Sequence, residues 1–422
     1  MAFDPRDPSF FDPAATLAEL RRVAGICDGC RRCHRLCPTF DVMLDTIDGH
    51  HGEVERVAPA DYRRMVDLCW QCKLCFNHCP YTPPHRFDID FPRLMLRAKA
   101  ARARVEGVTR QDRWLGNVDA VGRLGAATAP VANRANRWKP HRVLLEKAVG
   151  IHRDRNLPRF HHKTFARWWR ERKAVPPAGA RRAALFFTCS VNYNEPQVGR
   201  DAVSVLERNG CAVECPAGQV CCGMPYLDGG DVARATRNAE ANLRLLHPLV
   251  EAGAAVVVPQ PTCSYVLKKE YPLLVPGPQA QAVAGATRDF FEFLAARKAE
   301  GELALDFPGR GPGKVAYQMP CHLRAQNMGY KTRDVLQLIP GTEVTVVERC
   351  TAMDGTWAMK TEFYPLSLTV ARRAVAEMEA AAADTYVTDC SLSALQIEAV
   401  RGRKPAHPIS VLREAYGLPE QP

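Results

Sequence analysis

The sequence contains no long hydrophobic run. Nowhere do about 18 apolar residues follow one another, as they do in a membrane-spanning helix. The first residues include Asp4, Arg6, Asp7 and Asp12, where a secretory signal has an uninterrupted apolar stretch. We therefore expect a cytoplasmic protein, and we leave open a peripheral attachment to the inner face of the cell membrane. With 46% hydrophobic and 24% charged residues, the chain has the composition of a globular protein of two or three domains.

Nucleotide-binding fingerprints are also missing. No Gly-x-Gly-x-x-Gly pattern follows a predicted strand, so we expect neither flavin nor NAD on this chain. The glycine-rich segment 309–314 is similar to a phosphate-binding loop, but Val315 stands where that motif requires Ser or Thr. Any hydride transfer would then take place on a partner protein.

The positive charge does not follow a nucleic-acid-binding pattern. The formal charge is +11, yet the arginines are spread along the chain without aromatic interleaving or the spacing of a helix-turn-helix or zinc finger. We therefore expect no nucleic-acid partner. A basic face that contacts a membrane surface or an acidic partner stays open.

What the sequence does contain is cysteine, 17 residues in all. The pattern Cys-x2-Cys-x2-Cys-x3-Cys-Pro occurs twice, once ending at Pro38 and once at Pro80. Three cysteines at this spacing can bind one 4Fe-4S cluster, and the fourth binds the other cluster of a two-cluster protein. We therefore predict two 4Fe-4S clusters. The predicted ligands are Cys27, Cys30, Cys33 and Cys79 for one cluster, and Cys69, Cys72, Cys75 and Cys37 for the second.

Structural zinc and a disulfide framework fit these motifs less well. Structural zinc usually has two separated pairs of ligands, and disulfides would need an exported chain. Eight thiolates around two clusters would also remove roughly four of the formal positive charges. We expect the arginines between the ligands to offset cluster charge; they are Arg31, Arg32 and Arg35.

The cysteine motifs lie in a predicted helical unit, residues 12–105. Asp12 followed by Pro13 is a helix start, and segment 91–105 has the apolar spacing of a helix. Because the alternating strands of a small β-type ferredoxin are missing, we predict a helical two-cluster ferredoxin-like domain. Residues 106–180 are predicted to form a basic helical connector, whose tryptophans are Trp114, Trp138, Trp168 and Trp169.

The rest of the chain contains an internal repeat, with a first copy at 181–308 and a second, degenerate copy at 309–422. Strand, helix, strand, helix and strand follow one another in each copy, and a cysteine follows each strand. This order implies parallel sheets, whose carboxyl-end crevice binds ligands. We predict an α/β fold with a duplicated Rossmann-like domain. The matched predicted strands are 183–187 and 314–317, 212–214 and 344–347, and 254–259 and 385–388; the matched helices are 198–208 and 332–339, and 231–252 and 368–383.

The cysteines after these strands are candidate metal ligands. In the second copy Thr351 stands where the first copy has a doubled cysteine, so its site is the weaker one, with His322 as a candidate fourth ligand. Cys211 and Cys215 flank a strand and are predicted to be buried small hydrophobes. A further iron-sulfur cluster or metal in this half is left open. The candidate ligands are Cys189, Cys221, Cys222 and Cys263 in the first copy, and Cys321, Cys350 and Cys390 in the second.

Together these motifs resemble the iron-sulfur subunits of the heterodisulfide-reductase-related family, found in anaerobic glycerol-3-phosphate dehydrogenase, glycolate oxidase and lactate-utilisation systems. Segments 261–265, 320–324 and 354–357 are most similar to the glycerol-3-phosphate dehydrogenase branch. The resemblance implies a flavoprotein dehydrogenase partner, of glycerol-3-phosphate or 2-hydroxy-acid type. It further implies that electrons pass from that partner through the two clusters to quinone or another acceptor.

Two departures from the family pattern concern catalysis. Members that build a full noncubane cluster have Cys-x2-Cys late in each copy, whereas here Val266 follows Cys263 at that spacing, and the second copy lacks the doubled cysteine. Disulfide cleavage of the heterodisulfide-reductase kind needs the full sets. A reductase acting on a disulfide or peroxide-related substrate at the first copy, and a non-enzymatic redox sensor, are the alternatives to electron transfer.

Overall fold

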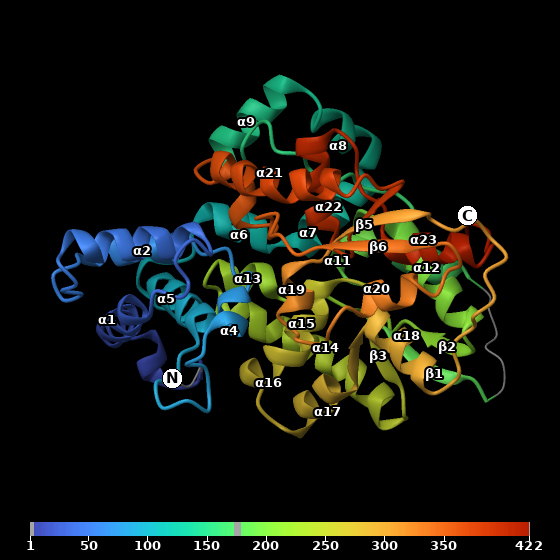
Figure 1. The fold of residues 1–422 in the computed structure, drawn as a ribbon, viewed down its shortest axis with the longest axis horizontal. Helices are drawn as coiled ribbons and strands as arrows, with labels where there is room; N and C mark the ends of the chain where they lie inside the picture. The colour runs from blue at the N-terminus through green and yellow to red at the C-terminus, as the bar shows by residue number, and fades with distance from the viewer. Residues whose placement is uncertain (1–3, 173–178, 422) are drawn as a thin grey trace.

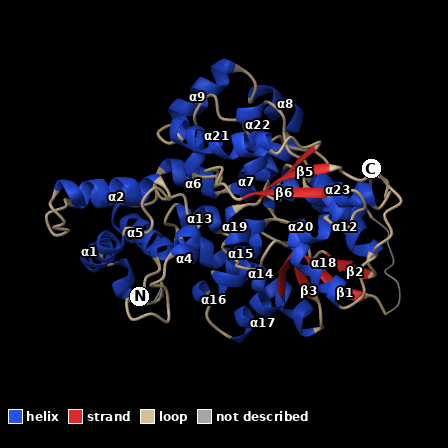
Figure 2. Cartoon of the chain, in the orientation of Figure 1, coloured by secondary structure: helices blue, strands red, loops and turns tan. Residues whose placement is uncertain are grey.

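The computed structural model describes residues 4–172 and 179–421; residues 173–178 of the predicted connector and Pro422 of the second copy lie outside them. The chain is an α/β protein in which helices surround two parallel sheets (Figure 2). An N-terminal helical unit extends from one end of the molecule, away from the sheets (Figure 1).

Strong start signals shape the N-terminal unit. Asp12 accepts a hydrogen bond from the backbone of Ala14 (2.8 Å), and Asp90 accepts one from Arg93 (3.0 Å), so both caps satisfy free N–H groups. The apolar faces of the helices meet in a core around Ile47. As predicted, the unit is helical. Its elements are η1 (Pro8–Phe11), α1 (Pro13–Cys30), α2 (Pro38–Gly49), α3 (Pro59–Asp67), α4 (Leu74–His78) and α5 (Phe91–Glu106).

The described part of the connector is helical and contacts both copies of the repeat. The hydroxyl of Tyr226, in the first copy, donates to Asn117 (3.3 Å), and the backbone N–H of Thr361, in the second, donates to Gly150 (2.9 Å). The connector therefore bridges the two copies. Its helices are α6 (Arg110–Gly116), α7 (Val118–Ala127), α8 (Ala129–Ala135), α9 (Lys139–Val149) and α10 (Phe165–Glu171).

The first copy of the repeat contains a four-stranded parallel sheet in the order β2-β1-β3-β4. Of its central strands, β3 is a short apolar run and β1 ends in one, as expected for parallel strands covered on both faces. Strand β4 was not predicted, because its three residues are all polar. The elements are β1 (Arg181–Leu185), α11 (Cys189–Tyr193), α12 (Pro196–Arg208), β2 (Cys211–Glu214), α13 (Met224–Asp228), α14 (Val232–Glu251), β3 (Ala255–Val258), α15 (Pro261–Lys269), α16 (Tyr271–Leu274), α17 (Pro278–Ala286), β4 (Thr287–Asp289) and α18 (Phe290–Ala299).

The second copy contains a three-stranded parallel sheet in the order β6-β5-β7. This matches the order of the first three strands of the other sheet, and each predicted strand is present within a few residues of its predicted position. The helix predicted at 332–339 ends earlier, at Leu336. The elements are β5 (Lys314–Gln318), α19 (Cys321–Arg324), α20 (Lys331–Leu336), β6 (Glu343–Val347), η2 (Trp357–Met359), α21 (Tyr364–Ala380), β7 (Thr385–Val387), α22 (Ser391–Arg401) and α23 (Pro408–Ala415).

The two copies share one hydrophobic core. Val257 of the first sheet belongs to the same buried cluster as Tyr317 and Val387 of the second. A buried ion pair between Arg413 on α23 and Asp201 on α12 (3.1 Å) also joins the copies. The carboxyl ends of both sheets are therefore held in a fixed relation to each other.

Candidate metal centres

The first cysteine motif begins on the last turn of α1. Cys27 and Cys30 lie on this helix, which ends where Arg31 adopts a left-handed conformation (φ 50°). The chain then turns through Cys33 to Cys37, the residue that precedes α2. The end of a helix, together with the turn that follows it, thus places the motif.

The arginines of this motif have different partners. Arg31 forms ion pairs with Asp28 and Asp48, so its charge is largely offset by these carboxylates. Arg32 acts on the thiols: burial raises the pKa of Cys33 to about 11, and the positive charge of Arg32 opposes that rise. Of these two, Arg32 is therefore the better placed to offset cluster charge.

The second motif is more deeply placed. Gln71 and Lys73 both have left-handed backbones (φ 54° and 64°), and these turns lead into α4, which carries Cys75. The side-chain amide of Gln71 donates to the Sγ of Cys69 (3.3 Å). Lys73 occupies the same position in its motif as Arg31 in the first, directly after the second cysteine. A left-handed residue at this position is thus common to both motifs.

Electrostatic interactions divide the eight thiols into two groups. Burial raises the pKa of Cys27 to about 12, and three neighbouring thiols raise it further: Cys33, Cys79 and Cys30. Burial also raises the pKa of Cys75 well above its usual range, with the largest thiol contributions from Cys72, Cys69 and Cys37. The remote cysteine of each motif therefore lies near the first three cysteines of the other.

These groups fit iron-sulfur ligation. Buried thiols with raised pKa values form thiolates only when a nearby cation compensates the charge, and a cluster core supplies it. Among the described residues, no group of three or more Cys, His, Asp or Glu side chains is arranged to hold a metal ion. In a cluster each thiolate binds a different iron, so its ligands do not need to converge on one point. Each group has four thiols, the number of ligands that a 4Fe-4S cluster takes.

The four candidate cysteines of the first copy come together at the carboxyl ends of its strands. Cys189 begins α11 after β1, and its Sγ lies 4.0 Å from that of Cys221. Cys222 hydrogen bonds with both Cys221 and Cys263. The bond with Cys221 lowers the pKa of Cys222, but the bond with Cys263 and burial raise it well above the usual range. The segments that follow β1, β2 and β3 thus bring four thiols together in one group.

The thiols of the second copy face the ferredoxin motifs. Hydrogen bonding with Cys321 lowers the pKa of Cys350 to about 7 against the effect of burial. The pKa of Cys321 is raised by Cys350, by burial, and then by Cys72 and Cys390. Cys72 belongs to the second motif, so this copy lies directly beside it.

Thr351 and His322 have hydrogen-bonding roles in the second copy. The hydroxyl of Thr351 lies 3.0 Å from that of Ser393. The Nε2 of His322 lies 2.9 Å from the carbonyl oxygen of Gln71, and its Nδ1 lies 2.9 Å from the hydroxyl of Thr262. Burial lowers the pKa of His322 to about 4, so the ring is neutral. Since both ring nitrogens have partners, hydrogen bonding explains this histidine better than ligation.

Cys211 and Cys215 lie apart from these groups. Cys211 is 1% exposed on β2, and Cys215 is partly buried against the same hydrophobic core. Both therefore pack as small hydrophobic side chains.

Two buried ion pairs beneath the second motif were missed in the sequence. Lys73 pairs with Glu270 (3.3 Å) and also donates to Gln71 (2.8 Å). Lys99 pairs with Asp228 (2.6 Å) and donates to the carbonyl oxygen of Cys69 (3.1 Å). Both carboxylates come from the first copy of the repeat, and no local pattern could have indicated such distant partners.

No helix within residues 4–172 and 179–421 has both the length and the hydropathy needed to cross a lipid bilayer.

Comparisons with known proteins agree with this arrangement. The model of the Fer4-like domain of citrate utilization protein B matches residues 18–105, and the model of the cysteine-rich domain matches twice, at 183–268 and 315–398. The chain is 32% identical to a subunit of the anaerobic glycerol-3-phosphate dehydrogenase of Escherichia coli over 306 residues, which cover 71% of this chain and 76% of the relative. It is 30% identical to lactate utilization protein A of Bacillus licheniformis over 56% of this chain and 98% of the relative. A subunit of the fumarate reductase (CoM/CoB) of Methanothermobacter marburgensis is 33% identical over 40% of this chain and 31% of its own length.

Proposed function

Since the chain belongs to the family of iron-sulfur oxidoreductase subunits that join a Fer4-like domain to two cysteine-rich domains, we propose that it relays electrons within a dehydrogenase complex. The donor is a flavoprotein dehydrogenase of glycerol-3-phosphate or 2-hydroxy-acid type, and the acceptor is quinone or another oxidant. Two 4Fe-4S clusters supply one-electron redox chemistry when bound. The role proposed for the chain is to bind the clusters through its cysteines, to provide the protein environment around them, and to hold them near one another.

The observation that carries this proposal is a continuous series of thiols, which begins in the ferredoxin domain. Cys33 of the first group contributes to the raised pKa of Cys75 in the second. Cys350 of the second copy contributes in the same way to the pKa of Cys72. The second group therefore lies between the first group and the repeat.

The series continues through the repeat. Cys390 contributes to the raised pKa values of both Cys321 and Cys263. Cys263 belongs to the four-thiol group of the first copy. Thiols that affect each other's pKa lie close together, so metals bound to them would also be close together. Electron transfer requires such short distances between metal centres.

The ligand sets and domain limits are part of the proposal. We assign the eight ferredoxin cysteines as crossed above, and a further metal centre to the first copy. The proposed units are the ferredoxin-like domain 12–105, the connector 106–180, and two Rossmann-like copies at 181–308 and 309–422. The shared strand order of the two sheets supports the duplication.

The function is tested on the full chain, purified anaerobically and analysed for iron, sulfide, zinc and flavin. We expect about eight irons and eight sulfides from the ferredoxin domain, with no flavin on the chain itself. A flavoprotein that copurifies should reduce the clusters, as followed by redox-titrated EPR. Zinc in place of iron would refute the clusters. Turnover of a disulfide or peroxide by the isolated chain would favour a reductase, and a stable complex without electron flow would favour a sensor.

The crossed ligand sets have their own test, replacement of Cys37 by Ser. We expect loss of the cluster held by Cys69, Cys72 and Cys75, because the remote cysteine serves the other motif. EPR of the reduced variant should show the signal of one isolated cluster. Damage confined to the cluster of Cys27, Cys30 and Cys33 would contradict the crossing.

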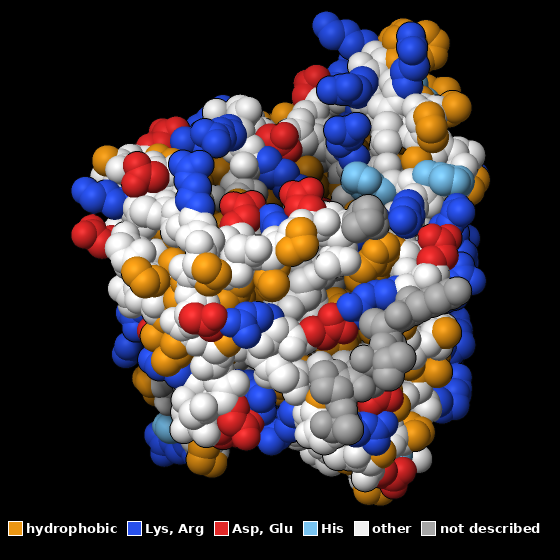
Figure 3. Space-filling model, turned by 90° about the vertical axis from the view of Figure 1, so that its right-hand side faces the viewer, with side chains coloured by type: hydrophobic (Ala, Val, Ile, Leu, Met, Phe, Trp, Pro, Cys, Tyr) orange, Lys and Arg blue, Asp and Glu red, His pale blue; other side chains and the backbone are white. Residues whose placement is uncertain are grey.

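The connector is proposed to contact the partner flavoprotein or the inner membrane surface. Side chains of Lys and Arg lie beside hydrophobic ones on the protrusion at the top of the molecule in Figure 3, where Figure 1 shows α8 and α9. Binding of the chain to vesicles with anionic lipids and to the flavoprotein is measured separately. The double variant Trp138→Ser/Leu144→Ser should lose one of these two interactions. Leu305→Ser, at an exposed site outside the connector, is the control. Large exposed hydrophobic side chains of the connector are Trp114, Leu124, Val131, Trp138 and Leu144.

A further inference from the structure

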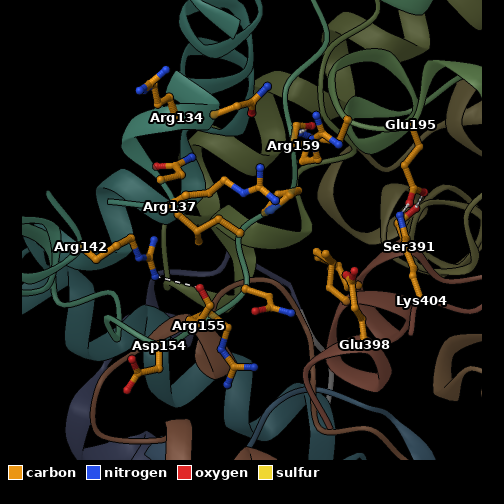
Figure 4. A pocket seen from close by; sticks show the side chains of 18 of the residues that line it. Arg134, Arg137, Arg142, Asp154, Arg155, Arg159, Glu195, Ser391, Glu398 and Lys404 are labelled. Carbon is orange, nitrogen blue, oxygen red and sulfur yellow. Dashed lines mark hydrogen bonds and ion pairs between the residues drawn. The ribbon is translucent and has the colours of Figure 1, made fainter. Parts of the chain in front are cut away.

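A cavity of about 1340 Å³ lies where the connector meets the two copies of the repeat (Figure 4). Its walls come from α8, α9 and the connector segment 153–161, from Ser190 to Glu195 of the first copy, and from α22 of the second. Small-molecule sites in proteins measure roughly 300–1,000 Å³, so this space admits a metabolite-sized ligand with water. The connector and both copies must be folded together to form it.

The cavity is strongly basic. Eight Arg and Lys residues line it, against three Asp and Glu residues. One of these carboxylates, Glu195, is already paired with Lys404, and Asp154 is exposed beside His152. The positive charge therefore exceeds what the lining carboxylates can neutralise.

Two exposed arginines supply much of this excess. Neither Arg137 nor Arg159 has an ion pair or side-chain hydrogen bond among the described residues. Figure 4 shows their side chains on one side of the cavity, with Glu195, Ser391 and Lys404 on the opposite side. A ligand in this space would meet two free guanidinium groups.

Two further arginines are buried in the wall without an ion pair to a described residue. Arg142 is 5% exposed and Arg155 is 3% exposed, and no carboxylate of a described residue lies within ion-pair distance of either. Arg142 donates to three backbone carbonyls at 2.8–2.9 Å, while its Nη1 has no partner. Arg155 donates to Ser367 (2.6 Å) and to Gln396, while its Nε has no partner.

These contacts hold both guanidinium groups in fixed positions, and Arg155 also lies over the ring of Tyr364 (4.5 Å to the centroid). The nearest carboxylates act only from beyond ion-pair distance and do not outweigh burial. Burial lowers the pKa of Arg155 to about 10, which reflects the cost of its unpaired charge. An anion bound nearby would offset that cost. Fixed cations in a partly enclosed space are the usual basis of carboxylate and phosphate recognition.

We propose that this cavity binds a small molecule that carries two or more carboxylate or phosphate groups. Two separate sets of cations, the exposed Arg137 and Arg159 and the buried Arg142 and Arg155, favour a polyanion over a single acidic group. Ser190 and Ser391 line the cavity and directly follow Cys189 and Cys390, so the cavity reaches the chain next to a candidate cysteine of each copy. This inference does not depend on the direction or partners of electron transfer.

The test is isothermal titration calorimetry on the full chain with its clusters intact, with pyrophosphate, citrate and acetate as probes. We expect one site per chain for pyrophosphate or citrate, no measurable binding of acetate, and weaker binding as ionic strength rises. The variant Arg137→Glu/Arg159→Glu should bind at least about tenfold more weakly. The control variant Arg237→Glu/Arg244→Glu makes the same change in charge at exposed positions of α14, which do not line the cavity. This variant should bind the probes as the wild type does.

Each outcome decides the proposal. Preference for pyrophosphate identifies a phosphate ligand and preference for citrate a carboxylate ligand, and both support it. Equal weakening in the two double variants would show general charge attraction and overturn it, as would the absence of polyanion binding. Binding only to vesicles of anionic lipid would also overturn it, because the occupant would then be a membrane. Iron content and EPR of each variant report separately on the clusters and on folding.

Discussion

The two copies of the repeat have the same central strand order, yet their strand ends differ. The first copy brings together four thiols, including the adjacent pair Cys221 and Cys222. The second has three, and Thr351 forms a hydroxyl contact with Ser393 instead of supplying a ligand. The second copy therefore keeps the central strand order without a doubled cysteine, and its strand ends present fewer thiols.

The copies also hold the ferredoxin domain in different ways. The first copy supplies Glu270 and Asp228, the buried carboxylates that pair with lysines beneath the second motif. The second supplies Trp357, whose ring centroid lies 5.0 Å from that of Trp70 and whose Nε1 donates to the backbone carbonyl oxygen of Asp67 (2.8 Å). Charge pairs thus join the first copy to the ferredoxin domain, and an aromatic contact with hydrogen bonds joins the second.

The largest expected effect comes from Cys222→Ser. If the first copy holds the working metal centre, this change should remove metal from the C-terminal half and slow electron delivery to the acceptor by at least about 100-fold. The ferredoxin clusters should still accept electrons. Iron analysis and anaerobic reduction kinetics measure both effects.

Cys211→Ser is the matched control for this variant. Cys211 is also a buried cysteine of the first copy, but it packs in the hydrophobic core and outside the thiol group. The Cys211→Ser variant should therefore retain the metal of the C-terminal half. If Cys222→Ser also kept its metal and its rate, the first copy would not be the active half.

Much of the fold could be predicted from the sequence, because its signals are local. The Asp12 cap appears where expected, and so do the strands that precede the candidate cysteines. Strand β4 could not be predicted, since its polar residues pair only because β3 lies beside them. The cavity and the ion pair of Lys73 with Glu270 depend on segments that meet only in the folded chain.

A smaller effect is expected from Cys350→Ser in the second copy. Three thiols without a fourth ligand make a poorer metal site, and both nitrogens of His322 are already hydrogen bonded. We expect less metal loss than in Cys222→Ser and a decrease in electron delivery within about tenfold. If Cys350→Ser emptied the C-terminal half while Cys222→Ser did not, the roles of the two copies would have to be exchanged.

The smallest effect on electron delivery is expected from Glu270→Gln, which weakens the charged attachment to the first copy and leaves the aromatic contact of the second. Removing one partner of a buried ion pair leaves the other charge unpaired, which costs about 3–5 kcal/mol in free energy of unfolding. Lys73 is 2% exposed and would lose its carboxylate partner, while it keeps its hydrogen bond to Gln71. Chemical denaturation at pH 7 should show this loss, while cluster reduction in the folded variant proceeds as in the wild type. Glu106→Gln, which breaks the exposed pair with Arg63, should change stability little.

The pH dependence gives this last prediction its sign. Burial disfavours the charged form of Glu270, but Lys73 and Arg93 outweigh burial and hold its pKa below the usual 4.5. Its contribution to stability is therefore complete above pH 4.5 and is lost as the pH falls through the lowered pKa of the folded state. The difference in unfolding free energy between wild type and Glu270→Gln should shrink in acid. A difference that stays constant from pH 7 into the acid range would mean that the ionised carboxylate of Glu270 does not stabilise this interface, and that the pair of Lys99 with Asp228 is the charged contact that joins the first copy to the ferredoxin domain.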